Sequence, residues 1–452
     1  MKKNLTEGHV LKVLVMFAIP YLMSSFLQTF YGMADLYIVG QFNNADAISA
    51  VSIGSQFMHM LTVVIIGLAM GTTVRIGNAV GRNDKKDISS IVGNTTILFL
   101  GISVVLTILL LSCTSFITDI MSTPLEAVSY TKSYLTICFI GIPFIVSYNV
   151  ISSIFRGAGD SKSPMYFVLI ACTTNIILDY IFVGYFSMGA TGAALATVLA
   201  QVLSTIIALI YMLRNTFIFS VQKSDFHIHI STIKNILTVG LPIALQDGFI
   251  QISFLIITII ANSRGLIFAT GVGITEKIIS FLFLVPSALL SALSASVAQN
   301  MGANKPERAK QMLYYGLIIS VSFGMICTLV CQMIPQQMLA LFTSDTQVIK
   351  AGSLYLMSYA WDCIFASIHF CFSGYFCGCN KPFISFIHNT ISIICIRIPG
   401  AYIASQVFPD TLFPMGWAAP LGSLLSAIIC IGFYIFLKRK ENIKKELLVF
   451  EK

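Results

Sequence analysis

The sequence predicts an all-α integral membrane protein with twelve transmembrane helices, arranged as two parallel six-helix repeats. Three observations support this fold class. Of the 452 residues, 56% are hydrophobic and 10% are charged, whereas soluble domains carry about 25% charged residues. The apolar residues form runs of about 18 residues or more, which is long enough for a helix to cross a bilayer. The second half of the chain also repeats the first, at an offset of 221 residues.

The repeat is carried by residues that recur in the same order in both halves. The recurring pairs are Gly81 and Gly302, Asn83 and Asn304, Tyr134 and Tyr355, Phe155 and Phe376, and Gly157 and Gly378. Pro20 has its counterpart in Pro242, at an offset of 222. So long a period indicates a domain-sized unit used twice, and duplicated membrane bundles place a substrate path between the repeats. A transporter is therefore the first hypothesis for the function.

Six hydrophobic spans are expected in each half. They cover residues 13–41, 46–80, 88–112, 125–155, 163–184 and 189–213 in the first half, and 232–262, 265–301, 308–333, 347–376, 381–407 and 414–437 in the second. The first span is too long for the hydrophobic region of a signal peptide. We therefore expect an N-terminal lobe over residues 1–213, a cytoplasmic linker over 214–234, and a C-terminal lobe with a basic tail over 235–452.

The basic residues predict the orientation of the chain. With a cytoplasmic N-terminus, 21 of the 27 Lys and Arg residues fall on the cytoplasmic side, and the outer side keeps Lys132, Arg264 and Lys350. Because Lys and Arg accumulate in cytoplasmic loops, we expect both termini in the cytoplasm. An even number of spans per half means that both repeats enter the membrane in the same direction.

Five acidic residues lie well inside spans: Asp35, Asp179, Asp247, Glu276 and Asp362. A carboxylate at this depth is costly, so it marks an ion or substrate pathway or is paired with a base. In the second half, Lys277 adjoins Glu276, and Arg397 lies at a depth similar to Asp362. Internal ion pairs are therefore the alternative to a pathway there. For Asp247, near mid-span, lining a cavity and forming a satisfied polar contact remain equally open.

In the first half, no basic residue lies near Asp35 or Asp179. At a rise of ~1.5 Å per residue, they lie about 9 Å and about 8 Å below the outer ends of their spans. Asn175 shares a helix face with Asp179, and Thr197 lies about 12 Å below the outer end of the sixth span. Oxygen ligands suit a small hard cation, and repulsion between close carboxylates favours uptake of a proton by one of them. We therefore expect H⁺ or Na⁺ to bind here; the alternative is that the acids stay neutral and hydrogen-bond to neighbouring helices.

The same residues belong to a pattern that resembles the multidrug and toxic compound extrusion (MATE) family over essentially the whole chain. The matching elements are Ile19-Pro20, Asp35 and Val39-Gly40; Arg156 to Asp160 with Pro164; Asn175 with Asp179; Gly189 with Gly192-Ala193; and Gly378 to Pro382. The pattern is closest to the bacterial group that includes DinF and MepA. This resemblance implies two six-helix lobes in a V around a central cavity, and an antiporter in which inward cation flow drives export.

The resemblance also implies roles for individual residues. Asp35, Asn175, Asp179 and Thr197 match the N-lobe cation site of the DinF-type proteins. Asp362 is the best match to the C-lobe Na⁺ site of the NorM-type branch, but that branch has a glutamate in the seventh span, where this chain offers Asp247 and Gln251. We predict a substrate cavity lined by Asp247, Gln251, Glu276 and Asp362, and hinges at Pro20, Pro143 and Pro242, where helices can kink.

The expected function is H⁺- or Na⁺-coupled export of amphipathic organic cations by alternating access. We expect a monomeric, multi-pass protein of a prokaryotic plasma membrane, surrounded by lipids, with no cofactor, nucleic-acid partner or enzymatic activity. The alternative is a flippase for lipids or lipid-linked oligosaccharides from the same superfamily. A flippase would need a basic cavity, whereas acids outnumber bases in the N-terminal half. A polytopic membrane transferase is less favoured, because the loops are too short and too poor in paired acids or histidines to form a catalytic site.

Overall fold

The computed structural model describes residues 5–121, 123–214 and 223–450. Over these residues the chain is helical and contains no strand, as the sequence predicts. The helices form two compact units. Unit 1 comprises Met1–Ala244 with Ala298–Pro306, and unit 2 comprises Leu245–Val297 with Glu307–Lys452. Residues 215–222 of the predicted linker lie outside the described residues.

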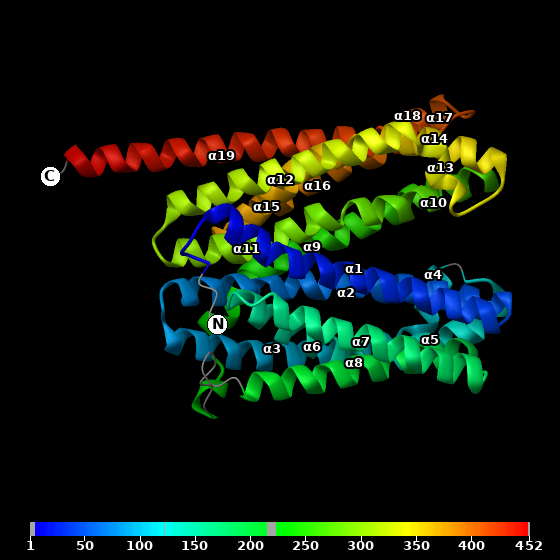
Figure 1. The fold of residues 1–452 in the computed structure, drawn as a ribbon, viewed down its shortest axis with the longest axis horizontal. Helices are drawn as coiled ribbons and strands as arrows, with labels where there is room; N and C mark the ends of the chain where they lie inside the picture. The colour runs from blue at the N-terminus through cyan, green and yellow to red at the C-terminus, as the bar shows by residue number, and fades with distance from the viewer. Residues whose placement is uncertain (1–4, 122, 215–222, 451–452) are drawn as a thin grey trace. The chain divides into compact units, whose positions relative to one another are not determined.

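Unit 1 contains the helices of the first repeat. In chain order they are α1 (Val10–Phe42), α2 (Ala45–Gly81), α3 (Lys85–Ser112), α4 (Thr114–Ile120), η1 (Leu125–Ala127), α5 (Val128–Ile140), α6 (Ile142–Gly157), α7 (Lys162–Asp179), η2 (Tyr180–Tyr185), α8 (Gly189–Arg214), η3 (Lys223–Phe226) and the first part of α9 (Ile230–Asn262). Helix α7 packs against α1 and α8, and α2 packs against α6 (Figure 1). The packing of α1, α7 and α8 brings the candidate site residues of this unit together.

Unit 2 contains the helices of the second repeat, beginning with the remainder of α9. They continue with α10 (Leu266–Leu282), α11 (Leu284–Gly302), α12 (Pro306–Met333), α13 (Pro335–Ala340), α14 (Thr346–Tyr359), α15 (Asp362–Gly378), α16 (Pro382–Ser392), η4 (Ile393–Arg397), α17 (Ile398–Val407), α18 (Phe413–Gly416) and α19 (Ala418–Phe450). Helix α15 packs against α16 and α19, and α10 packs against α14.

Most of the predicted spans appear as long helices, and several are broken. Within the described residues, nine helical segments are long and apolar enough to cross a membrane, and two bent pairs raise the number to 11. The pairs are Leu125–Ile140 with Ile142–Gly157, bent by 49°, and Leu266–Leu282 with Leu284–Gly302, bent by 41°. The tenth expected span, 347–376, is divided into α14, of 14 residues, and α15, of 17 residues. Each piece alone is shorter than a full membrane span, which needs about 20 residues.

Corresponding helices of the two repeats end in the same type of turn. Asn83 after α2 and Asn304 after α11 both adopt left-handed backbone, with φ of 58° and 56°. The next residue closes the turn in each case: Asp84 N donates to Ala79 O at 3.0 Å, and Lys305 N donates to Asn300 O at 2.8 Å. This is the Schellman arrangement, which favours Gly or Asn because left-handed backbone crowds most side chains.

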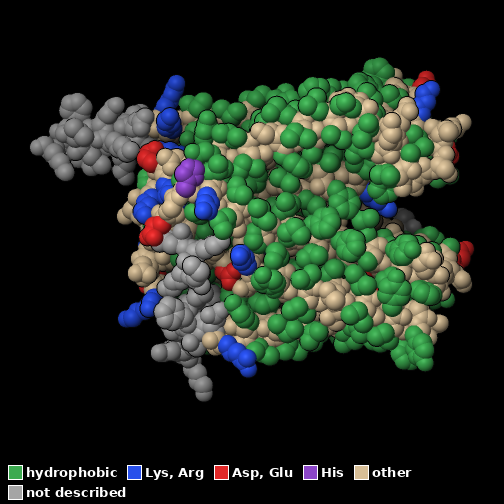
Figure 2. Space-filling view, viewed as in Figure 1, with side chains coloured by type: hydrophobic (Ala, Val, Ile, Leu, Met, Phe, Trp, Pro, Cys, Tyr) green, Lys and Arg blue, Asp and Glu red, His purple; other side chains and the backbone are tan. Residues whose placement is uncertain are grey.

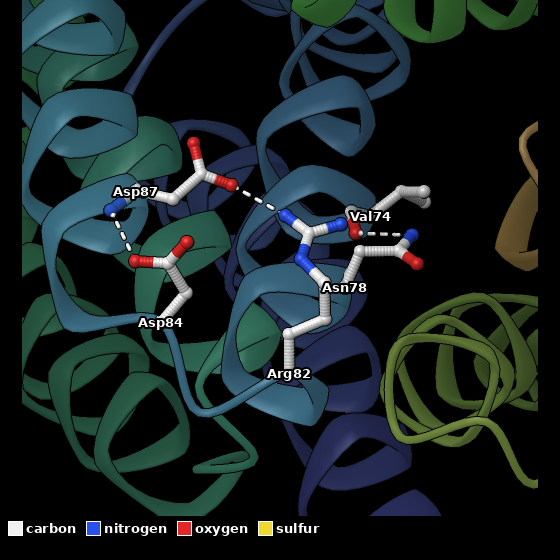
Figure 3. Close-up of polar contacts among 5 residues, drawn as sticks. All are labelled: Val74, Asn78, Arg82, Asp84 and Asp87. Atoms are coloured by element: carbon white, nitrogen blue, oxygen red, sulfur yellow. Dashed lines mark hydrogen bonds and ion pairs between the residues drawn. The ribbon is translucent and has the colours of Figure 1, made fainter.

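The start of α3 is defined by side chains close to the first of these turns (Figure 3). Asp84 Oδ1 accepts a hydrogen bond from the backbone N–H of Asp87 at 3.1 Å, which caps one free N–H group of the helix. Arg82 forms an ion pair with Asp87, and Asn78 Nδ2 donates to Val74 O within α2. Local contacts therefore determine where α2 ends and α3 begins.

Hydrophobic side chains cover the flanks of the helices, and Lys and Arg side chains gather at helix ends on the face drawn in Figure 2. On α3, Leu100, Val104 and Ile108 are 60%, 48% and 66% exposed. Their spacing places them on one face of the helix. An apolar face of this extent is suited to contact with lipid.

Candidate functional site

Three helices of unit 1 bring the four predicted cation-site residues together. Asp35 lies on α1, Asn175 and Asp179 lie on α7, and Thr197 lies on α8. Asp179 is fully buried, Asn175 and Asp35 are 2% and 3% exposed, and Thr197 is half-buried. Since α7 packs between α1 and α8, residues about 160 positions apart in sequence become neighbours.

Hydrogen bonds connect three of these side chains. Thr197 Oγ1 donates to Asp35 Oδ2 at 3.3 Å, and Asn175 Nδ2 donates to Thr197 Oγ1 at 3.4 Å. The Asp179 carboxyl group lies within hydrogen-bonding reach of the Asp35 carboxyl group. Two carboxylates form a hydrogen bond only when a proton lies between them.

Several oxygens of the cluster have no hydrogen-bond donor among the described residues. They are Asp35 Oδ1, Asn175 Oδ1 and both carboxylate oxygens of Asp179. The ion pairs found among the described residues, Arg82–Asp87 and Lys310–Glu307, lie elsewhere. Buried oxygens without a donor are costly unless a proton or a cation satisfies them. Chemically, the cluster is therefore suited to hold H⁺ or Na⁺.

Two further residues extend this cluster, and the sequence analysis missed both. Tyr31 lies one turn before Asp35 on α1, and Gln201 lies one turn after Thr197 on α8. Their side chains lie within hydrogen-bonding reach of each other, and Tyr31 is close enough to Asp35 to interact with it electrostatically. The spacing of four residues from Asp35 and from Thr197 was the available signal, because such residues share a helix face.

A π-helical turn begins directly after Asp179. Regular α-helix ends at this residue, and η2 covers Tyr180–Tyr185. The sequence predicts one continuous span over 163–184, which the structure divides into two helix types. π-helical turns are rare and occur frequently at functional sites.

A second group of charged residues lies in unit 2. Glu276 on α10 accepts a hydrogen bond from Thr258 at 3.4 Å, and Arg397 donates to the hydroxyl of Tyr359 at 2.9 Å. Arg397 lies near both Glu276 and Asp362 and attracts both carboxylates, but it forms no direct ion pair with either among the described residues. Lys277, which adjoins Glu276 in sequence, is exposed.

The remaining predicted residues lie apart from these two groups. Asp247 and Gln251 are half-buried on α9. Within the described residues, no hydrogen bond or ion pair joins them to Glu276 or Asp362. Their assignment to a substrate cavity stays a prediction.

The three predicted hinge prolines lie in different settings. Pro20 and Pro242 lie inside the continuous helices α1 and α9, whereas Pro143 opens α6 just after the 49° bend. A role as hinges stays a prediction for all three.

Comparison with known proteins places this architecture in a family. The MatE family model matches residues 20–181 and 242–403, one segment in each repeat. A "Probable multidrug resistance protein NorM" of Thermotoga maritima is 28% identical over 401 residues, covering 88% of this chain and 86% of the relative. "Probable multidrug resistance protein YpnP" of Bacillus subtilis is 26% identical over 88% of both chains. "Multidrug export protein MepA" of Staphylococcus aureus is 25% identical over 81% of both.

Solved structures share the fold. A MATE transporter in its straight conformation superposes with a TM-score of 0.90 at 23% identity and covers 98% of both chains. A MOP superfamily transporter from Pyrococcus furiosus has a TM-score of 0.89 at 23% identity, covering 95% of this chain and 96% of that one. The binding pocket of that protein is described as having reverse polarity, suggesting a different function. The matched family model spans most of both repeats, so this chain belongs to the MatE family of multidrug efflux transporters and is a multi-pass membrane protein.

Proposed function

We propose that this protein exports amphipathic organic cations in exchange for H⁺ or Na⁺, by alternating access across a bacterial plasma membrane. The observation that carries this proposal is the buried cluster of Asp35, Asp179, Asn175 and Thr197. Within the part of the chain that the structure describes, it combines two carboxylates in hydrogen-bonding reach of each other with oxygens that lack donors, and no base forms an ion pair with it. The bacterial relatives support the plasma membrane, and the distribution of basic residues supports cytoplasmic termini.

The proposed cycle uses the charge of this cluster. With the two acids ionised, the negative potential of the N-terminal repeat favours a cationic substrate taken from the cytoplasm or the inner leaflet. Entry of H⁺ or Na⁺ from outside lowers the negative charge of the Asp35–Asp179 pair, and the substrate is released outward. The coupling cation and the substrate thereby bind to different states of the protein, which is the condition for exchange.

The membrane potential sets a limit on this exchange. Each positive charge that moves inward contributes about 2.3 kcal/mol per 100 mV. Exchange of one H⁺ or Na⁺ for one monovalent organic cation moves no net charge, so the chemical gradient of the coupling ion must then drive export. Transport of a second coupling cation in each cycle would make export depend on the membrane potential.

The proposal is tested by removing each acid in turn. We expect Asp35→Asn and Asp179→Asn to slow coupled efflux of ethidium from cells about ten-fold or more, because losing a charged contact of about 1.5–3 kcal/mol corresponds to that factor or more. Asp119→Asn on α4 is the matched control, since Asp119 is exposed. Protein content of the membrane fraction shows that each variant inserts. Efflux at the wild-type rate in both variants would refute the proposal.

The wild-type protein and the two aspartate variants also test the flippase alternative. A flippase would move a fluorescent anionic lipid between leaflets of proteoliposomes independently of Asp35 and Asp179. We expect no such movement above that of empty vesicles.

A further inference from the structure

The two repeats contain a π-helical turn in corresponding spans, but they place opposite charges beside it. In unit 1, η2 follows Asp179, and in unit 2, η4 ends at Arg397. The two turns lie in the fifth span of each repeat, so Arg397 lies in the span that corresponds to the one carrying Asn175 and Asp179. A basic residue therefore stands in the span of the second repeat whose counterpart in the first carries an amide and an acid of the cation cluster.

The guanidinium of Arg397 is held by two neighbours. Its Nη2 donates to the Tyr359 hydroxyl at 2.9 Å, and its central carbon lies 4.4 Å from the centroid of the Phe254 ring. A cation over an aromatic face is stabilised by the ring quadrupole. The Nε atom of Arg397 is buried and has no acceptor.

Each of the two acids near Arg397 has one carboxylate oxygen without a hydrogen-bond donor among the described residues. Asp362 is 2% exposed, and its Oδ1 has no donor within the described part of the chain, whereas Ser423 lies within hydrogen-bonding reach of its carboxyl group. Glu276 Oε1 also lacks a donor among the residues that the structure describes, and the Thr258 hydroxyl, which lies 3.0 Å from Phe254 O, is 3.4 Å from Oε2. Arg397 attracts both carboxylates, and His369 also lies within its electrostatic reach.

We propose that Arg397 is a built-in cation that does, in the C-terminal repeat, what the coupling H⁺ or Na⁺ does in the N-terminal repeat. This inference rests on the proposed function of the Asp35–Asp179 cluster. A guanidinium stays charged at any pH that the protein meets and is tethered to the chain. It therefore balances one of the two negative charges of Glu276 and Asp362 permanently, and only the N-terminal repeat binds a cation that is transported.

The consequence is a limit on how many cations the protein binds. Carboxylates without their tethered cation would offer oxygen ligands to a mobile one. Replacing Arg397 by a neutral residue should therefore create a second binding site, whereas a replacement that keeps the charge should not.

The experiment measures cation binding to the purified full-length protein in nanodiscs, with radioactive Na⁺ and, separately, with a pH-indicator dye that reports proton uptake. We expect Arg397→Gln to double the amount of one of these cations bound at saturation. The increase should survive Asp179→Asn and disappear with Asp362→Asn. The Arg397→Lys variant keeps the charge and should bind the wild-type amount of cation. The Lys277→Gln variant removes the neighbouring exposed base and should also bind the wild-type amount. Wild-type binding of both cations by Arg397→Gln would overturn the inference.

A measurement on the wild-type protein avoids any effect of substitution on folding. Dicyclohexylcarbodiimide enters membranes and reacts with protonated carboxyl groups, and mass spectrometry locates the adducts. We expect Asp35 or Asp179 to be labelled faster than Glu276 and Asp362, because Arg397 beside the latter two favours their ionised form. Equal or faster labelling of Glu276 or Asp362 would contradict the inference.

The same binding experiment distinguishes failure of the proposed function from failure of the inference about Arg397. If Asp179→Asn alone leaves wild-type cation binding intact, the N-terminal site is wrong, whatever Arg397→Gln does. If Asp179→Asn abolishes binding but Arg397→Gln adds none, only the role of Arg397 is wrong.

Discussion

At the scale of single residues, the hydroxyl of Thr197 connects the cation cluster. It donates to Asp35 and accepts from Asn175, so it determines how one carboxylate and one amide face each other. Thr197 is half-buried, whereas the residues it joins are almost fully buried. A hydroxyl in this position can also turn to coordinate a bound cation with its lone pairs.

Thr197→Val removes this hydroxyl and keeps the shape of the side chain. We expect the affinity for the coupling cation to fall about five-fold, since one hydrogen bond is worth about 1 kcal/mol. The concentration of H⁺ or Na⁺ that gives half-maximal efflux measures this change.

Thr205→Val on the same helix is the control for Thr197→Val. Thr205 donates to Phe144 O at 3.0 Å, away from the cluster, so its loss should affect thermal stability without changing the cation dependence. Equal cation dependence in both variants would argue against a role for Thr197 in binding.

The sequence predicted the four residues of this cluster because acids inside apolar spans are rare and their spacing indicates a shared face. It did not predict Tyr31 and Gln201, since their one signal was a spacing of four residues from Asp35 and from Thr197, and an uncharged side chain does not stand out within an apolar span as an acid does. The environment of Arg397 was predicted only in part. Similar depth indicated its proximity to Asp362, but the stacking on Phe254 depends on how separate helices pack.

At the scale of elements, two glycines allow the ends of α2 and α11 to touch within unit 1. A Cβ on Gly81 would overlap the backbone oxygen of Gln299, and a Cβ on Gly302 would overlap that of Asn78. Gln299 and Asn78 are themselves 221 residues apart, so the contact follows the symmetry of the repeat. Backbones can approach so closely only where a side chain is absent.

Gly81→Ala should therefore destabilise the protein. The added methyl group must separate two backbones, and such overpacking costs about 1–3 kcal/mol. A lower midpoint of thermal unfolding for the protein in detergent measures the effect. Gly101→Ala on α3 is the control, because a Cβ there meets nothing within 4 Å and alanine favours a helix. Equal unfolding midpoints for both variants would contradict the proposed tight contact.

The spans themselves were well predicted, because continuous hydrophobicity is a strong signal for a membrane helix. The bend beside Gly141 and Pro143 also had a sequence signal. The break at Ala360 and Trp361 had none, since neither residue is a helix breaker. The π-helical turns η2 and η4 were missed for a similar reason: the extra residue that widens the turn leaves the composition unchanged.

At the scale of the whole molecule, the duplication supplies one scaffold for two different chemistries. Turns and close glycine contacts recur in both repeats, whereas the charged residues do not. The first repeat carries an acid pair without a base, and the second carries acids beside an arginine. Hydropathy and the repeat predicted the family-level architecture, but a cluster of oxygen ligands can bind either H⁺ or Na⁺, so the coupling ion requires an experiment.

The central claim is that a coupling cation binds between Asp35 and Asp179. The most direct test reconstitutes the wild-type protein and the Asp35→Asn/Asp179→Asn double variant in proteoliposomes and varies the H⁺ and Na⁺ gradients independently. We predict that at least one gradient drives ethidium accumulation in wild-type vesicles and that neither does so in the double variant. Gradient-driven accumulation in the double variant at the wild-type rate would contradict the claim.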